Sequence, residues 1–215
     1  MYFYIYIMDN NNTDFLVNDF NEFKNILVVC EDFYKYPFSV FKNSVDTGYK
    51  SEWPYGARTI PFINDNDNDI IHNISKHIPH AADPTIKFKS RGGSSGSFLM
   101  NTKNDYGIWN HTDQSNLNEL IWAAVVYTHP FPVLACGTSL NSYTNTSYKH
   151  INSYSFDDQT FYARDNNRWF KNIYIGNVFN KLVIYTGNSF HSPIGSFGHT
   201  KFNCRGVNTF FFTSI

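Results

Sequence analysis

The sequence predicts a mainly β fold, a sandwich or a barrel. The chain has 21 Phe and 15 Tyr, and aromatic residues favour strands. It has no Ala/Leu/Glu-rich heptads of the kind that build helical bundles. Short apolar runs recur from about Thr85 to the end, as in all-β domains. A mainly β chain of 215 residues is commonly one domain, so we expect a single domain over residues 1–215.

The first part of the chain, residues 1–84, predicts an α/β layer that supports the β core. MYFYIYIM at the start and ILVVCEDFY at Ile26–Tyr34 are expected strands. Pro37 is expected to open a helix, and Pro79 to end a second one. The apolar positions that share one helix face are Phe38, Phe41 and Val45 in the first helix, and Ile70, Ile71, Ile74 and Ile78 in the second.

Residues 85–215 predict the β core. A strand is expected at IKFKS, and RGGSSGS, Arg91–Ser97, is expected to form a hairpin turn. A polar, aromatic-rich stretch at about 141–171 has little periodicity, and we expect it to be an ordered lid inserted in the core. The further expected strands are Phe98–Met100, Asp105–Trp109, Ile121–Thr128, Ile173–Val178, Lys181–Tyr185 and Asn208–Thr213.

Composition argues against several classes of partner. The net charge is -1 and no basic run occurs, so neither nucleic acid nor a membrane surface is an expected partner. MYFYIYIM is too short to span a bilayer and lacks the features of a signal peptide. Cys30, Cys136 and Cys204 are odd in number and show no CxxC spacing, so we expect no disulfide framework and a cytoplasmic location.

The motif WNHTDQS, Trp109–Ser115, places a histidine and an aspartate two residues apart. Side chains at i and i+2 of a strand point to the same side, so His111 and Asp113 are candidate ligands of one metal ion. Two histidines and a carboxylate form the site of non-haem Fe(II) oxygenases, which requires a second histidine. The candidate is His191, which follows the expected strand Lys181–Tyr185 and a TGN turn.

Arg205 is expected to begin the last strand, with Val207, Thr209 and Phe211 on its side at a period of two. An arginine that faces the inside of a β core requires an anion, because an isolated buried charge is unfavourable. Taken alone, Arg205 could equally be a salt-bridged strand end. Its separation of 14 residues from His191 makes it a candidate anion-binding residue of the same site.

The order of these motifs resembles the Fe(II)/2-oxoglutarate-dependent dioxygenases, particularly their prolyl-4-hydroxylase-like branch. The resemblance covers roughly residues 100–213 and implies a double-stranded β-helix, or jelly-roll, core. The matching segments are HTD at His111–Asp113, WAAVVYTHP at Trp122–Pro130, CGTSL at Cys136–Leu140, which resembles a turn of the family, NKLVIYTGNSFHS at Asn180–Ser192, and a final strand that carries Arg205.

By this resemblance His111, Asp113 and His191 would bind Fe(II), and Arg205 would pair with the distal carboxylate of 2-oxoglutarate. Relatives often have Ser or Thr two residues after the arginine, where this chain has Val207, so Thr209 or Tyr127 is the candidate for the second cosubstrate contact. Prolyl hydroxylases proper commonly use Lys in place of this arginine, so a peptidyl-proline substrate is not inherited. Halogenases of the family lack the acidic ligand, and the presence of Asp113 favours oxygenation.

Simpler interpretations account for the other candidate motifs. His72, His77 and His80 are near one another in sequence, but no Cys or carboxylate completes a metal set. DNDND at Asp65–Asp69 lacks the glycine and glutamate of a calcium loop, and RGGSSGS lacks the ending of a P-loop. A nucleophilic role for Cys136 or Cys204, with His129 or His199, has no sign of a lowered thiol pKa to support it.

We therefore expect an Fe(II)-, 2-oxoglutarate- and O2-dependent oxygenase that hydroxylates an unidentified small molecule or protein side chain. A non-catalytic jelly-roll binding or structural module is the alternative from another class, since a fold does not fix a function. A cupin-like metal enzyme that does not use 2-oxoglutarate is the second alternative. The substrate and the oligomeric state are not encoded in any motif that we can identify.

Overall fold

The computed structural model describes residues 3–7, 26–50, 56–59, 68–78, 87–91, 95–104, 110–113, 121–143 and 168–215. Its helices are α1 (Pro37–Asp46) and α2 (Asn68–Ser75). Its strands are β1 (Phe3–Ile7), β2 (Ile26–Cys30), β3 (Tyr49–Lys50), β4 (Ala57–Thr59), β5 (Phe88–Ser90), β6 (Ser97–Asn101), β7 (Ile121–Tyr127), β8 (Thr138–Tyr143), β9 (Trp169–Ile175), β10 (Leu182–Thr186), β11 (His191–Pro193) and β12 (Arg205–Ser214).

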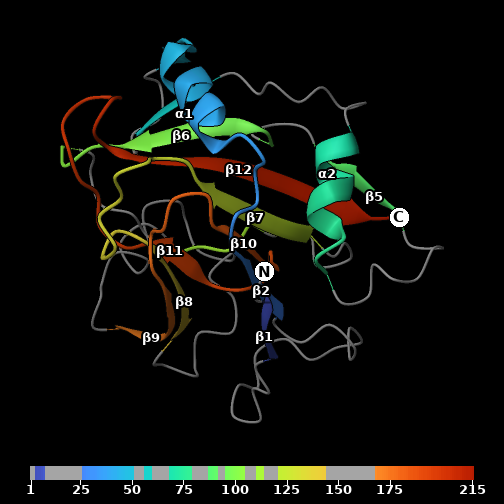
Figure 1. The fold of residues 1–215 in the computed structure, drawn as a ribbon. Coiled ribbons are helices and arrows are strands. Elements are labelled where there is room, and N and C mark those ends of the chain that lie inside the picture. Colours follow the sequence, from blue (N-terminus) through green and yellow to red (C-terminus); the bar gives the residue numbers. More distant parts are fainter. Residues whose placement is uncertain are drawn as a thin grey trace.

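The strands in the described ranges form two antiparallel sheets (Figure 1). The major sheet has the order β1-β2-β10-β7-β12-β6-β4-β3, and β5 pairs with the far end of β12. The minor sheet has the order β11-β8-β9. Strands distant in sequence are therefore neighbours, because β10 lies between β2 and β7, and β12 lies between β7 and β6. This double-sheet arrangement is a jelly roll, which confirms the fold class predicted from the sequence.

The inner face of the major sheet packs against the minor sheet. Tyr127 and Val207 are opposite one another on β7 and β12, and both contact an apolar cluster that includes Leu140 of β8 and Ile175 of β9. Alternation along each strand explains this set, because inward positions recur every second residue. The buried members are Leu27, Ala123, Val125, Tyr127, Leu140, Ile175, Val183, Tyr185 and Val207.

Both helices lie on the other side of the major sheet (Figure 1). In α2, Ile71 and Ile74 are fully buried against outward-facing residues of β7, β10 and β12, among them Trp122 and Phe212. Helix α1 starts at Pro37, whose fixed φ suits the first helical turn, and its Val45 packs against Met100 and Cys204. The two helices of residues 1–84 thus form a layer outside the sheet, whereas the strands of the same part of the chain, β1 to β4, belong to the major sheet itself.

Some expected elements differ from the structure. CGTSL was predicted as a turn, which is wrong for its last three residues, because Thr138–Leu140 belong to strand β8. The polar sequence of this strand hid it, since only Leu140 contributes to the apolar cluster. The strand expected at Ile173–Val178 begins earlier and ends at Ile175. The strand expected at Asp105–Trp109, and residues 144–167 of the expected lid, lie outside the described residues.

The remaining global expectations concern cysteines and membrane spans. Cys30, Cys136 and Cys204 are all buried and free. Within the ranges that the structure describes, neither helix has the length and apolar character needed to cross a bilayer.

Candidate functional site

A short β-bridge brings the two candidate histidines together. The backbone N–H of His111 donates to the carbonyl of His191 at 3.0 Å, and the reciprocal bond measures 2.9 Å. The N–H of Asp113 donates to the carbonyl of Gly187 at 2.9 Å, which fixes the HxD segment against the β10–β11 turn. Main-chain hydrogen bonds therefore hold residues that are 80 positions apart in sequence at one place.

The side chains of these three residues form a compact cluster. The Nε2 atom of His191 lies 3.4 Å from Oδ2 of Asp113, and Nε2 of His111 lies 3.7 Å from Oδ1. One ligand atom from each residue can be chosen so that all lie within 4.8 Å of one another. Ligands about 2.1 Å from a common metal ion would lie about 3 Å apart on adjacent octahedral positions, so small side-chain adjustments suffice to bind one ion.

His191 has the tautomer that a metal ligand needs. Its Nδ1 atom lies 3.1 Å from the carbonyl oxygen of Ser189, which can only accept, so Nδ1 carries the proton and Nε2 keeps its lone pair. Burial lowers the pKa of His191 to about 4, with the neighbouring His111 acting in the same direction and Asp113 opposing it. The imidazole is therefore neutral at physiological pH, as binding of a cation requires.

Asp113 provides the clearest sign that a cation belongs here. Its Oδ2 atom is buried and accepts no hydrogen bond from the residues that the structure describes. Buried carboxylate oxygens normally have donors or a cation beside them. Two imidazole nitrogens and one carboxylate are the donor set of mononuclear Fe(II) sites that keep open positions for other ligands. The residues present fit such a metal ion.

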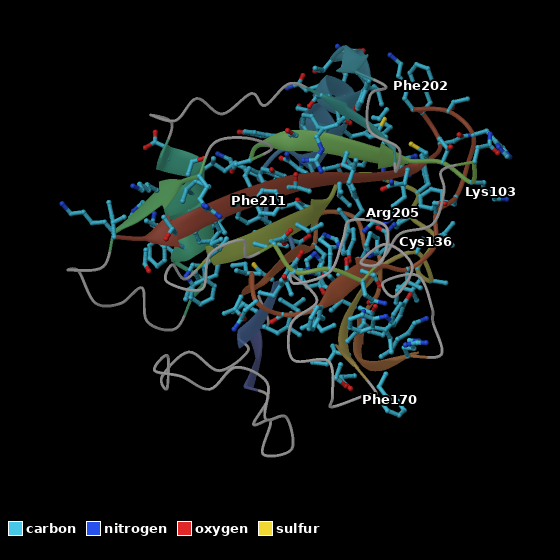
Figure 2. All side chains as sticks on the ribbon, turned by 180° about the vertical axis from the view of Figure 1, so that it is seen from behind. Lys103, Cys136, Phe170, Phe202, Arg205 and Phe211 are labelled. Carbon is cyan, nitrogen blue, oxygen red and sulfur yellow. The ribbon has the colours of Figure 1, made fainter. Side chains whose placement is uncertain are left out.

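Arg205 lies on the inner face of the major sheet, at the start of β12 (Figure 2). Its side chain is only 2% exposed. The guanidinium donates to the carbonyls of Cys136 at 2.9 Å and Gly137 at 3.4 Å, and to Oδ1 of Asn101 at 3.2 Å. All three acceptors are neutral. In the described part of the chain, no carboxylate lies within ion-pair distance of Arg205.

The two candidates for a second anion contact are Tyr127, which is opposite Val207 on the neighbouring strand, and Thr209, which is on the same strand as Arg205. The Tyr127 ring centroid lies 5.8 Å from the guanidinium carbon, and its hydroxyl donates to Oγ1 of Thr138 at 2.8 Å. Thr209 is buried two inward positions along β12, and its hydroxyl lies 3.4 Å from the carbonyl of Ser97. Val207, which lies between Arg205 and Thr209 on that side, packs in the inner apolar cluster.

Two residues near this site were not predicted from the sequence. Tyr185 is fully buried, and its ring centroid lies 4.6 Å from that of His191. Burial raises its pKa well above the usual value, while the charges of Asp113 and Arg205 act on it in opposite directions. The charges of Asp113 and Arg205 therefore both act on Tyr185. The sequence feature that could have identified this residue is its inward position in the strand LVIYT.

Arg58 is the other unpredicted residue. It lies on β4 opposite Leu99, which packs against the inner cluster. Burial lowers its pKa, and the negative charge of Asp113 opposes that change. A short strand in a segment without apolar alternation gave no sequence signal for this position.

The alternative motifs have structural roles in the regions that are described. His129 packs edge-on against Phe41 and Phe197, and its Nδ1 accepts the N–H of Phe131. Burial raises the pKa of the Cys136 thiol, which disfavours a nucleophilic thiolate. His72 and His77 form no three-residue metal cluster with other described groups, whereas His80 lies outside the described residues.

Comparison with known proteins gives a match of fold. No family model matches the sequence, and no curated protein matches it. The crystal structure of HygX from Streptomyces hygroscopicus with nickel and 2-oxoglutarate bound gives a TM-score of 0.50 at 10% identity, covering 87% of this chain and 82% of HygX. The structure of HygX with nickel, 2-oxoglutarate and hygromycin B bound gives 0.51, with the same identity and coverage. At this identity the likeness is one of fold.

Proposed function

We propose that this protein is an Fe(II)- and 2-oxoglutarate-dependent oxygenase that hydroxylates a small molecule or a peptidyl side chain. The strongest support is that a possible cation site and a possible anion site occur together on the inner side of the sandwich. A His-Asp-His cluster with a buried, unpaired carboxylate oxygen occurs together with a fully buried arginine that has only neutral acceptors among the described residues. A cation would pair with the carboxylate of the cluster, and an anion would pair with the arginine.

The metal would be held by Nε2 of His191, Nε2 of His111 and the carboxylate of Asp113. His191 is oriented by the bond from its Nδ1–H to Ser189, and His111 by its backbone bonds to His191. Such outer contacts hold a ligand in position before the ion arrives and so strengthen binding. Three protein ligands leave positions for a bidentate cosubstrate and for O2.

Arg205 would hold the distal carboxylate of 2-oxoglutarate. Its guanidinium is fixed by carbonyls of the β7–β8 loop, and burial excludes water that would weaken the ion pair. Bound Fe(II) and 2-oxoglutarate together supply the activation of O2 that oxidises the substrate, with 2-oxoglutarate converted to succinate and CO2. Binding of 2-oxoglutarate and a metal by HygX, which shares the fold, agrees with this assignment.

The first test is an anaerobic titration of the metal-free protein with Fe(II) and then 2-oxoglutarate, followed through the visible metal-to-ligand charge-transfer band. We expect a band in the wild-type protein. Asp113→Ala should weaken Fe(II) binding by more than about 100-fold, because loss of a ligand exceeds the effect of losing an outer contact. Arg205→Met should leave Fe(II) binding intact and weaken 2-oxoglutarate binding by about 10- to 100-fold, the effect of removing a charged hydrogen bond.

Matched controls are Asp46→Ala on the exposed face of α1 and Arg91→Met at an exposed position directly after β5. Circular dichroism would establish that each variant is folded, and Arg205→Lys provides a milder second variant. A folded wild-type protein without a band would contradict the proposal and favour a non-catalytic jelly-roll module. Oxygen consumption that is independent of 2-oxoglutarate would instead favour a cupin-like metal enzyme.

A further inference from the structure

The distal carboxylate of 2-oxoglutarate would need hydrogen-bond donors besides Arg205. The hydroxyl groups of the two expected candidates, Tyr127 and Thr209, already donate to other acceptors. A hydroxyl has a single O–H to donate. The O–H of Tyr127 is directed at Thr138, and that of Thr209 at the carbonyl of Ser97. Val207 has no polar group. These three residues therefore leave the second contact to the carboxylate without a donor.

Asn177, just after β9, has unused donors. It is 1% exposed, and neither its amide nitrogen nor its amide oxygen has a hydrogen-bond partner among the residues that the structure describes. Buried side-chain amides are nearly always paired, with protein, water or ligand. The amide nitrogen has two N–H groups to donate, which suits a carboxylate oxygen.

The chain around Asn177 places its side chain in the interior of the protein. A Cβ on Gly176 would meet the side chain of Leu134, which is exposed on the outside of the β7–β8 loop. Asn177 comes two residues after Ile175 of the inner cluster and is buried, so its side chain lies in the interior. Its backbone N–H donates to the carbonyl of Leu134 at 3.1 Å, which holds this part of the main chain against the β7–β8 loop.

Gly137 is a close neighbour both of Arg205 and of the main chain at Asn177. The carbonyl of Gly137 accepts a bond from the guanidinium, while a Cβ on the same residue would approach the backbone nitrogen of Asn177 to 3.0 Å. Thr138, which follows Gly137, is opposite Ile175 in the sheet and takes the hydroxyl bond of Tyr127. Figure 2 shows Arg205 beside Cys136, in the interior where these segments meet.

We infer that the side-chain amide of Asn177 is the second contact for the carboxylate held by Arg205, and that it sets the preference for a 2-oxoacid with a distal acid group. The inference rests on the proposed function. It assigns to the segment after β9 a role that relatives give to a hydroxyl residue on the last strand. The carboxylate would be shared between a cation from β12 and a neutral donor from the segment that follows β9.

The test measures 2-oxoacid binding to the anaerobic Fe(II) protein, by the charge-transfer band, for wild type and Asn177→Leu. Leucine has the same branched shape as asparagine, with two methyl groups in place of the amide oxygen and nitrogen, and no donors. We expect 2-oxoglutarate to bind about tenfold more weakly to the variant, the effect of one hydrogen bond to a charged group. Binding of 2-oxobutyrate, which lacks the distal carboxylate, should be equal in the two proteins, and so should Fe(II) binding.

Stability without ligand separates this role from a structural one. If the amide serves the ligand, metal-free Asn177→Leu should be at least as stable as wild type, because an unpaired buried amide is replaced by an apolar group. Equal 2-oxoglutarate affinity in the two proteins, or a loss of stability with no change in affinity, would overturn the inference while leaving the proposed function in place. A wild-type protein that binds no 2-oxoglutarate would overturn both.

Discussion

His191 makes the stability of the metal-free protein depend on pH. Burial lowers the pKa of its imidazole to about 4, whereas the unfolded chain has the usual value of about 6.5. Between these values the unfolded state binds more protons, so stability is complete above pH 6.5 and falls as the pH falls towards 4. A shift of this size corresponds to about 3 kcal/mol at the low end of the window.

The measurement is the urea midpoint of chelator-treated protein between pH 4.5 and 7.5, for wild type, His191→Leu and the control His199→Leu, whose side chain is exposed. His191→Leu should flatten the dependence, and His199→Leu should keep it. An unchanged slope in folded His191→Leu would show that another group is responsible.

At the level of single residues, the sequence allowed prediction of those whose side chains are typical metal ligands. The HTD motif and His191 could be paired because only certain donor sets bind Fe(II), and the structure does bring the three residues together. Asn177 could not be recognised, because asparagine is abundant in this chain and a missing hydrogen bond is a property of coordinates alone. The roles of all these residues stay predictions until binding is measured.

At the scale of elements, a buried polar network behind the β-bridge holds the strands that carry the two histidines. The amide nitrogen of Asn141 on β8 donates to Oδ1 of Asn110 and, at 3.3 Å, to Oγ of Ser192. These partners are the chain neighbours of His111 and His191. Ser139 adds a contact of 3.2 Å to Ser192. The network therefore fixes how β8, β11 and the HTD segment lie relative to one another.

We expect Asn141→Leu to weaken Fe(II) binding by about tenfold in a protein that remains folded, because the ligands lose their fixed geometry. Ser142→Ala is the matched control, since this hydroxyl is on the same strand but bonds the exposed side chain of Asn172. Fe(II) titration of both variants by calorimetry provides the comparison. Equal dissociation constants for Asn141→Leu and wild type would show that the bridge alone positions the histidines.

Strands were predictable where most of their residues are apolar or aromatic. Ile121–Tyr127 and Leu182–Thr186 were recognised because their residues are wholly buried and apolar or aromatic for the most part. Strand β8 was missed because its side chains serve the polar network and not a core, so its pattern is that of a loop. The three-residue strand β11 is too short to show any periodicity.

At the scale of the whole molecule, the strand order could not be read from the sequence. The pairing of β2 with β10 joins residues about 155 positions apart, and no local pattern encodes such a contact. Its consequence is that β1 and β2, from the first 30 residues, extend the same sheet that carries Tyr127 and Arg205. Residues 1–84, the expected support, therefore contribute strands to the major sheet itself as well as the two helices that cover it.

This arrangement predicts that the protein unfolds as one unit. Ile74 of α2 is fully buried against strands from both ends of the chain, and Ile74→Ala should lower the free energy of unfolding by about 2 to 5 kcal/mol. Because the helix and the sheet share a core, circular dichroism and tryptophan fluorescence should report one transition that shifts as a whole. The control Ile215→Ala, at an exposed terminal side chain, should leave the transition unchanged. Two separate transitions, only one of them moved by Ile74→Ala, would instead indicate that the N-terminal layer and the jelly-roll core are independent domains.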